Sequence, residues 1–285
     1  MHKVGIVTDS TCDMRPAELE AIDVVMVPLT VHFGDEHLRD WLDLTPEGFY
    51  PKLAAFTAGL PTTSQPSPAD FTKAYEALAE AGAEEIVSIH LSAALSGTYE
   101  SAVLAAKTSP IPVRVVDGKK ASCATALIVK AAVEAREAGA DAAAVEARAL
   151  EVASETRLFF LLDTLDYLVK GGRAGKAAGL AASLLNIKPV LRVNEDGIIE
   201  PFTKVRGRKQ AIAALAQHVA EDAAANGRMR ISLLHACCTA DAQALADAIK
   251  AAGADVEWLP NHEIGAVIGV YTGPGAIGAA YYPAG

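Results

Sequence analysis

The sequence has few cysteines and none of the spacings that cysteine-rich proteins share. Its 285 residues include four cysteines, two of them adjacent at Cys237 and Cys238, and no CxxC pair. This number and spacing do not provide a disulfide framework, and they argue against a zinc site. We therefore expect no metal ion, and we interpret Cys237 and Cys238 as ordinary packing residues.

The chain also lacks an excess of positive charge. It has 25 lysines and arginines against 35 aspartates and glutamates, a formal net charge of −10 at pH 7. A free-standing nucleic-acid-binding protein presents a basic face, so no nucleic-acid partner is expected. Small acidic ligands remain compatible with this charge, because a local site can differ in sign from the whole chain.

Uninterrupted hydrophobic runs are missing as well. Residues 1–7 show no long apolar segment of the secretory type, and we expect a cytoplasmic protein. Residues 264–285 carry no charge, but several glycines and Pro274 make this stretch a poor helix. We predict a pair of buried, glycine-linked strands here and no stable membrane insertion.

What is present is an alternation of short β-branched runs with alanine-rich segments of helical length, which is typical of α/β proteins. Strands are predicted at residues 4–8, 24–33, 85–90, 113–117, 158–162, 189–193, 198–205, 229–234 and 266–272. Helices are predicted at residues 46–57, 68–80, 99–107, 122–137, 142–154, 176–185, 207–225 and 240–251.

The length favours two α/β domains over one. In the first half, helices separate the strands, which predicts a largely parallel sheet flanked by helices. In the second half, Asp196-Gly197 lies between two strands and predicts a hairpin within a mixed sheet. We place the boundary after two consecutive helical segments, giving an N-terminal domain at 1–155 with hydroxyl-rich ligand loops and a C-terminal domain at 156–285.

Three loops rich in hydroxyl residues, at 8–13, 62–68 and 95–99, follow strands or precede helices. Taken singly, each loop is more simply a helix cap, and Asp9 and Asp13 are interpreted as caps or turn formers rather than paired catalytic acids. Three such loops at the carboxyl ends of strands in one sheet nevertheless indicate a ligand site, which suits an anionic group.

Other motifs have limited weight. Arg173 lies between a glycine pair and a predicted helix, and its planar guanidinium suits a carboxylate or phosphate. Gly175-Lys176 does not end a P-loop, because Lys170 stands where that motif needs glycine. Ser96 lacks the preceding glycine of a GxSxG nucleophile elbow. No cofactor is predicted.

Five short motifs in order along the chain resemble the DegV family of bacterial lipid-binding proteins. They are Ile6-Val7-Thr8-Asp9-Ser10, Thr63-Ser64-Gln65-Pro66, Leu95-Ser96-Gly97-Thr98-Tyr99, Gly171-Gly172-Arg173 and Gly273-Pro274-Gly275. The resemblance implies a two-domain α/β fold that holds a long-chain fatty acid in a buried tunnel, with the carboxylate near the domain interface. Some members present that acid to a separate ATP-dependent fatty acid kinase, which makes acyl phosphate.

By this resemblance, Thr63 and Ser96 hold the head group, with Ser64 and Gly97 beside them, and Arg173 handles the phosphorylated product or meets the kinase. This chain departs from the family at two positions. The residue before Thr272 is Tyr271, where many members carry a head-group histidine, and Asp117 is followed by glycine where serine is usual. A tyrosine hydroxyl can donate to a carboxylate but cannot become cationic.

Two alternatives to a non-catalytic lipid-binding protein remain open from the residues. In the first, Ser96 is the nucleophile of an acyl hydrolase and His90 or Asp9 assists it. In the second, the same loops bind a sugar phosphate or a nucleotide. The chemistry of the pocket walls distinguishes a lipid from a sugar phosphate or nucleotide, because a continuous apolar tunnel suits only a lipid tail.

Overall fold

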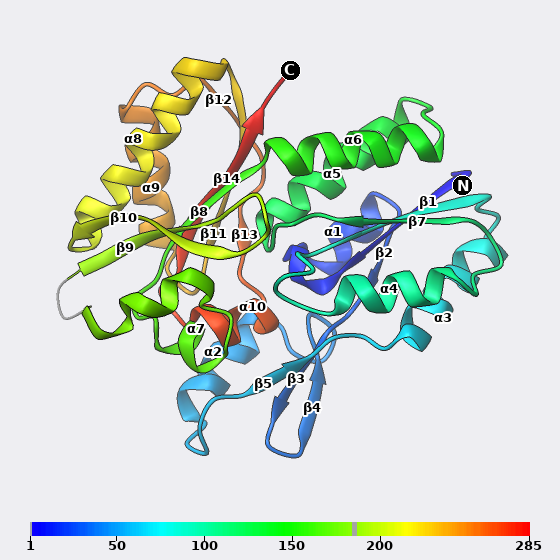
Figure 1. Ribbon diagram of the computed structural model, residues 1–285, viewed down its shortest axis with the longest axis horizontal. Helices are drawn as coiled ribbons and strands as arrows, with labels where there is room; N and C mark the ends of the chain where they lie inside the picture. Colours follow the sequence, from blue (N-terminus) through cyan, green and yellow to red (C-terminus); the bar gives the residue numbers. More distant parts are fainter. Residues whose placement is uncertain (1, 184–186) are drawn as a thin grey trace.

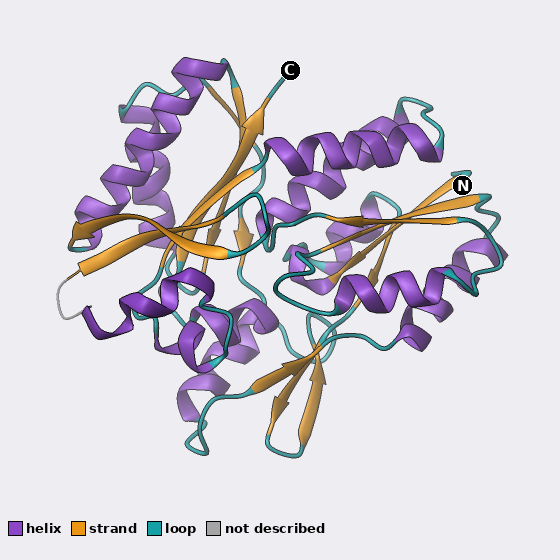
Figure 2. Cartoon of the chain, in the orientation of Figure 1, coloured by secondary structure: helices purple, strands orange, loops and turns teal. Residues whose placement is uncertain are grey.

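Two β-sheets with helices packed on them form the body of the protein (Figures 1 and 2). The computed structural model describes residues 2–183 and 187–285. In the first sheet every neighbouring pair is parallel. Across this sheet the strands are β2 (Val24–Val27), β1 (Val4–Asp9), β6 (Glu85–His90) and β7 (Val113–Asp117).

The second sheet is mixed. Its strands lie in the order β10 (Ile199–Arg206), β9 (Ile187–Val193), β8 (Arg157–Leu161), β14 (Ile277–Pro283), β11 (Met229–His235) and β12 (Val256–Trp258), and the short β13 (His262–Glu263) also pairs with β11. The predicted hairpin is present as the antiparallel β9–β10 pair, with Gly197 at φ 76° in its turn. The predicted fold class is therefore confirmed.

Helices cover both sheets and fill the space between them (Figure 1). The first sheet carries α1 (Pro16–Ala21), α3 (Pro68–Glu80), α4 (Thr98–Ala106), α5 (Cys123–Glu137) and α6 (Ala142–Glu155), whereas α8 (Arg208–Asn226) and α9 (Thr239–Ala251) cover the second. Helix α5 contacts β1 and β6 as well as β11 and β14, so it packs against both sheets. The largest buried cluster likewise takes residues from both halves of the chain. The domain boundary at 155/156 stays a prediction.

The prediction of a strand at 266–272 was wrong, because this segment is helix α10 (Ala266–Thr272). The backbone N–H groups of Ala266 and Val267 donate to Oδ1 of the buried Asp40, at 3.0 and 3.4 Å, and so the helix start is capped. Gly269 lets the helix lie against Phe49, whose Cε1 would be 2.5 Å from an added Cβ. These tertiary contacts override the strand preference of the valines and isoleucine. Only the second predicted strand of this pair exists, as β14.

Two other expectations need correction. The predicted strand at 24–33 is two strands, because Pro28 follows β2, and β3 (Thr30–Phe33) pairs instead with β4 (Glu36–Arg39) and β5 (Thr62–Ser64) in a separate antiparallel sheet. The predicted helix at 176–185 is the 3₁₀ segment η2 (Gly175–Ser183), and its last two positions lie outside the described residues. Helices α2 (Pro46–Ala55) and α7 (Asp166–Lys170) complete the layer around α10.

Over residues 2–183 and 187–285, no helix combines the length and the apolar character needed to cross a membrane. The uncharged C-terminal stretch is instead accommodated by burial in the protein, since Ala279, Ala280 and Tyr281 of β14 are fully buried.

We predict that Asp40 makes the stability of the fold pH-dependent. Burial raises the pKa of this carboxyl from its ordinary 3.8 to about 7. Between about pH 4 and about pH 7 the folded state keeps a proton that the unfolded state has lost, so the free energy of unfolding falls as the pH rises. Asp40→Asn removes this titration and keeps an oxygen for Ala266. Urea unfolding of both proteins across this pH range should show a smaller decrease in the free energy of unfolding for the variant. An equal decrease in the two proteins would contradict the assignment.

Candidate functional site

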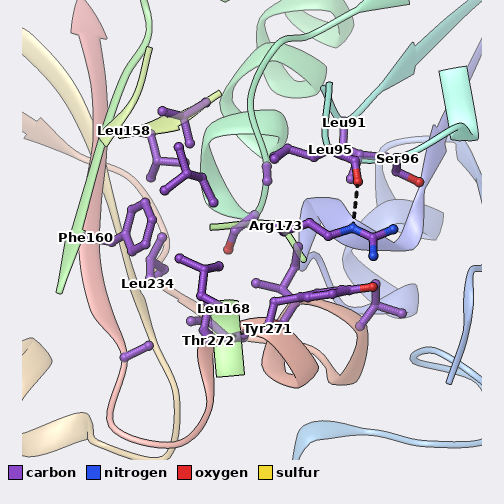
Figure 3. A pocket seen from close by; sticks show the side chains of 18 of the residues that line it. Leu91, Leu95, Ser96, Leu158, Phe160, Leu168, Arg173, Leu234, Tyr271 and Thr272 are labelled. Carbon is purple, nitrogen blue, oxygen red and sulfur yellow. Dashed lines mark hydrogen bonds between the residues drawn. The ribbon is translucent and has the colours of Figure 1, made fainter. Parts of the chain in front are cut away.

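A largely apolar cavity lies between the two sheets and α10 (Figure 3). Its volume is about 90 Å³, several times the roughly 10–15 Å³ that one water molecule needs. The apolar lining comes from segments far apart in the chain and includes Leu29, Leu91, Leu158, Phe160, Val193 and Leu234. Such a lining favours a hydrocarbon group over a compact polar ligand.

Polar side chains gather at one end of this cavity. Thr63 comes from β5, Ser96 from the loop between β6 and α4, Arg173 from the loop after α7, and Tyr271 from α10. The hydroxyls of Thr63 and Tyr271 are 2.5 Å apart, and that of Ser96 lies 2.9 Å from Oγ1 of Thr98. We refer to Thr63, Ser96, Arg173 and Tyr271 as the polar end.

Arg173 lies across the ring of Tyr271, with its guanidinium carbon 5.0 Å from the ring centroid. Its Nε donates to the carbonyl of Leu95 at 3.3 Å, the bond drawn in Figure 3, and its Nη1 donates to the carbonyl of Gly171 at 2.9 Å. Gly171 is needed here, because an added Cβ would lie 2.4 Å from Cδ1 of Tyr271. The guanidinium retains further N–H groups that can meet an anion.

The structure does not bring every residue of the predicted site to the cavity. Ser64 follows Thr63 on the same strand, and alternate residues of a strand face opposite sides. The Ser64 hydroxyl therefore lies outside the lining and bonds Nε2 of His32 at 2.9 Å. Gly97 is the N-cap residue before α4, where an added Cβ would lie 2.3 Å from Oε1 of Gln65, and it does not line the cavity either.

One residue that sequence reasoning missed is Ser122, which also lines the cavity. Its hydroxyl donates to Oδ2 of Asp13 at 2.5 Å, while Oδ1 of Asp13 accepts from the N–H of Gly265 at 2.9 Å. Burial raises the pKa of the Asp13 carboxyl well above its ordinary range. The sequence marked Ser122 only as a helix start, and no local signal indicated a cavity.

His90 is not placed to activate Ser96. Its Nδ1 lies 3.0 Å from Oδ2 of Asp9 and its Nε2 lies 2.7 Å from the hydroxyl of Ser88, and all three residues are fully buried. The arrangement has the order of a catalytic triad, but Ser88 cannot be reached by a substrate. Asp9 accepts from the N–H of Thr11 and caps a short 3₁₀ turn, as predicted. The cluster therefore holds β1 and β6 together.

Metal chemistry finds no support in the residues that the structure describes, since no three His, Cys, Asp or Glu side chains among them converge as ligands. The polar end offers three hydroxyls and one guanidinium, all of which can donate hydrogen bonds. This donor set suits a single carboxylate.

A family model described as an uncharacterised protein of the DegV family matches residues 3–284. A DegV domain-containing protein of Streptomyces coelicolor is 41% identical over 275 residues, which is 96% of each chain. A fatty-acid-binding DegV family protein from Thermus thermophilus has a similar structure, with a TM-score of 0.92, 36% identity, and coverage of 99% of this chain and 100% of that one. The fatty acid binding protein DegV of Bacillus subtilis gives a TM-score of 0.89 and 31% identity, with 99% of each chain covered.

We predict that Thr63 and Tyr271 are energetically coupled. Removing one hydroxyl leaves the other without its partner in a partly buried site, so a double-mutant cycle with Thr63→Val and Tyr271→Phe should give a coupling of about 1 kcal/mol in the free energy of unfolding. Ser64→Ala is the control for Thr63, because Ser64 points the other way. Coupling of Ser64 to Tyr271, or none for Thr63, would contradict the geometry.

Proposed function

Because the chain belongs to the DegV family, we propose that it binds a long-chain fatty acid in this cavity and catalyses no reaction alone. The observation that carries the proposal is an apolar cavity that ends at hydroxyls and a guanidinium. Related structures described as fatty-acid-binding proteins support it.

We place the carboxylate of the ligand at the polar end. The hydroxyls of Thr63, Ser96 and Tyr271 can each donate to it, and a hydrogen bond to a charged group contributes about 1.5–3 kcal/mol. Tyr271 cannot carry the positive charge of the histidine that many family members have, but Arg173 lies over its ring and provides a cation at the same place. Ser64 and Gly97, expected beside the head group, lie outside the cavity lining and are left out of the proposed contacts.

The tail supplies most of the affinity. Burying one methylene is worth about 0.8 kcal/mol, so a tail of about fourteen contributes on the order of 11 kcal/mol before the costs of ordering and association. A sugar phosphate or nucleotide would leave the apolar walls without a partner. The geometry therefore favours the lipid over this alternative. It also disfavours a hydrolase, because His90 is held between Asp9 and Ser88, and among the described residues the Ser96 hydroxyl bonds Thr98 and no histidine.

The resemblance also implies that the acid is presented to a separate fatty acid kinase, and we include this role in the proposal. We also propose a cytoplasmic location, where ATP is available. Arg173 supports this role because its side chain is exposed while also lining the cavity. A guanidinium at the mouth can hold the new phosphate by paired hydrogen bonds.

The binding proposal predicts that purified protein carries a fatty acid. Denaturing mass spectrometry of an organic extract should find a long-chain acid at close to one per chain, or uptake of added palmitate or oleate to that level. Thr63→Ala and Ser96→Ala should weaken binding roughly tenfold to 150-fold without unfolding the protein, through the loss of one hydrogen bond to a charged group.

Ser64→Ala is the matched control, since it removes the neighbouring hydroxyl on the opposite face of β5. An empty extract that takes up neither acid would overturn the proposed function. Stoichiometric lipid of unchanged affinity in both variants would show instead that the head group lies elsewhere.

The kinase proposal predicts that the protein forms no acyl phosphate with ATP alone and forms it when a fatty acid kinase is added. Arg173→Ala should lower the rate of product formation while the protein still binds palmitate, because the tail supplies most of the affinity. Phosphate transfer can be followed with radiolabelled ATP. Formation of acyl phosphate without a kinase, or no formation with one, would contradict this assignment.

A further inference from the structure

A second hollow lies directly behind the apolar cavity. It is a cleft of about 680 Å³ whose lining is mainly polar, with Lys120, Arg157, Arg192 and Glu200 among its residues. The cavity and the cleft share two lining residues, Leu158 and Val193. Leu158 and Val193 therefore form a common boundary between a space suited to hydrocarbon and a space suited to water and ions.

The shared wall is built into the second sheet. Leu158 on β8 and Val193 on β9 are direct partners in the antiparallel register, and only 3% and 6% of their surfaces are exposed. The loop before α5 continues the wall, because Ala121 lines the apolar cavity while its neighbour Lys120 lines the cleft. The wall is thus made by the residues shared in the sheet and by two adjacent residues in the loop.

This wall stands opposite the polar end. In Figure 3, Leu158 and Phe160 lie on one side of the cavity, while Ser96, Arg173 and Tyr271 lie on the other. A ligand whose head group is held at the polar end can direct its far end toward Leu158.

The groups behind the wall are unfavourable neighbours for a hydrocarbon. Lys120 is only 4% exposed and its ammonium makes no hydrogen bond or ion pair with the residues that the structure describes. Arg192 pairs with Glu200 at 2.6 Å on the same side. A methyl group that entered this cleft would displace water from charged groups, which costs free energy instead of gaining it.

We propose that the Leu158–Val193 pair determines the longest acyl chain that the protein binds, by closing the tail cavity against the polar cleft. This inference rests on the proposed function and adds the residues that set the chain-length limit. Each methylene that the wall excludes from burial lowers affinity roughly fourfold, so an acid two carbons beyond the limit loses roughly fifteenfold relative to full burial.

The test compares the affinities of saturated fatty acids of increasing length for the full-length protein and its variants. Wild-type affinity should rise with length to a limit and then stop rising. In Leu158→Ala the limit should move up by about two carbons, so that the ratio of affinities for the longer and shorter acids changes roughly fifteenfold. Val193→Ala is a smaller truncation of the same wall and should also raise the chain-length limit. It provides the test if Leu158→Ala does not fold.

Leu161→Ala is the matched control. Leu161 lies on the same strand, is fully buried and lines neither hollow, because it faces the core on the other side of the sheet. It should reduce stability as Leu158→Ala does and leave the length profile unchanged. A profile that moves equally in Leu161→Ala, or that no wall variant moves, would overturn the wall assignment. If wild-type protein binds no fatty acid of any length, the proposed function itself is wrong.

Discussion

The candidate site depends on how α10 is held at its first turn. Two buried aspartates from the N-terminal third of the chain accept hydrogen bonds from three consecutive N–H groups: Asp13 from Gly265, and Asp40 from Ala266 and Val267. These bonds satisfy N–H groups that a helix start leaves without partners. They also join segments more than 220 residues apart in sequence. With its start fixed, α10 places Tyr271 beside Thr63 and under Arg173.

With α10 fixed in this way, the cavity has a polar end and an apolar remainder. At the polar end, hydroxyls and a guanidinium are held by contacts with each other and with backbone carbonyls, so the donors are in place before an anion arrives. The rest of the lining is mostly leucine, isoleucine, valine, phenylalanine and alanine. The hydroxyls of Ser122 and Thr272, which also line it, donate to Asp13 and to the carbonyl of Ile268. A molecule with one acidic end and a long hydrocarbon matches both parts, and neither part alone selects it.

Much of this arrangement could be predicted from the sequence, because local patterns decide it. Asp196-Gly197 specifies the hairpin, and the alternation of strands and helices specifies the parallel first sheet. The motifs containing Thr63, Ser96 and Arg173 are recognisable without a structure, although their convergence is a tertiary fact.

Other features depend on contacts that sequence patterns do not contain. The segment 266–272 has the composition of a strand and becomes a helix because Asp40 caps it and Gly269 fits against Phe49. Whether Thr63 or Ser64 faces the cavity depends on the register of β5, a three-residue strand that the sequence did not predict. The pairing of Leu158 with Val193 is likewise visible only in the sheet register.

A crystal structure of the protein grown with palmitate tests the central claim most directly. The account predicts continuous tubular density that begins with a carboxylate in hydrogen-bond contact with Thr63 or Ser96, passes along the apolar lining and ends before Leu158. Density for the acid on the protein surface only, with the cavity filled by rearranged side chains, would contradict it.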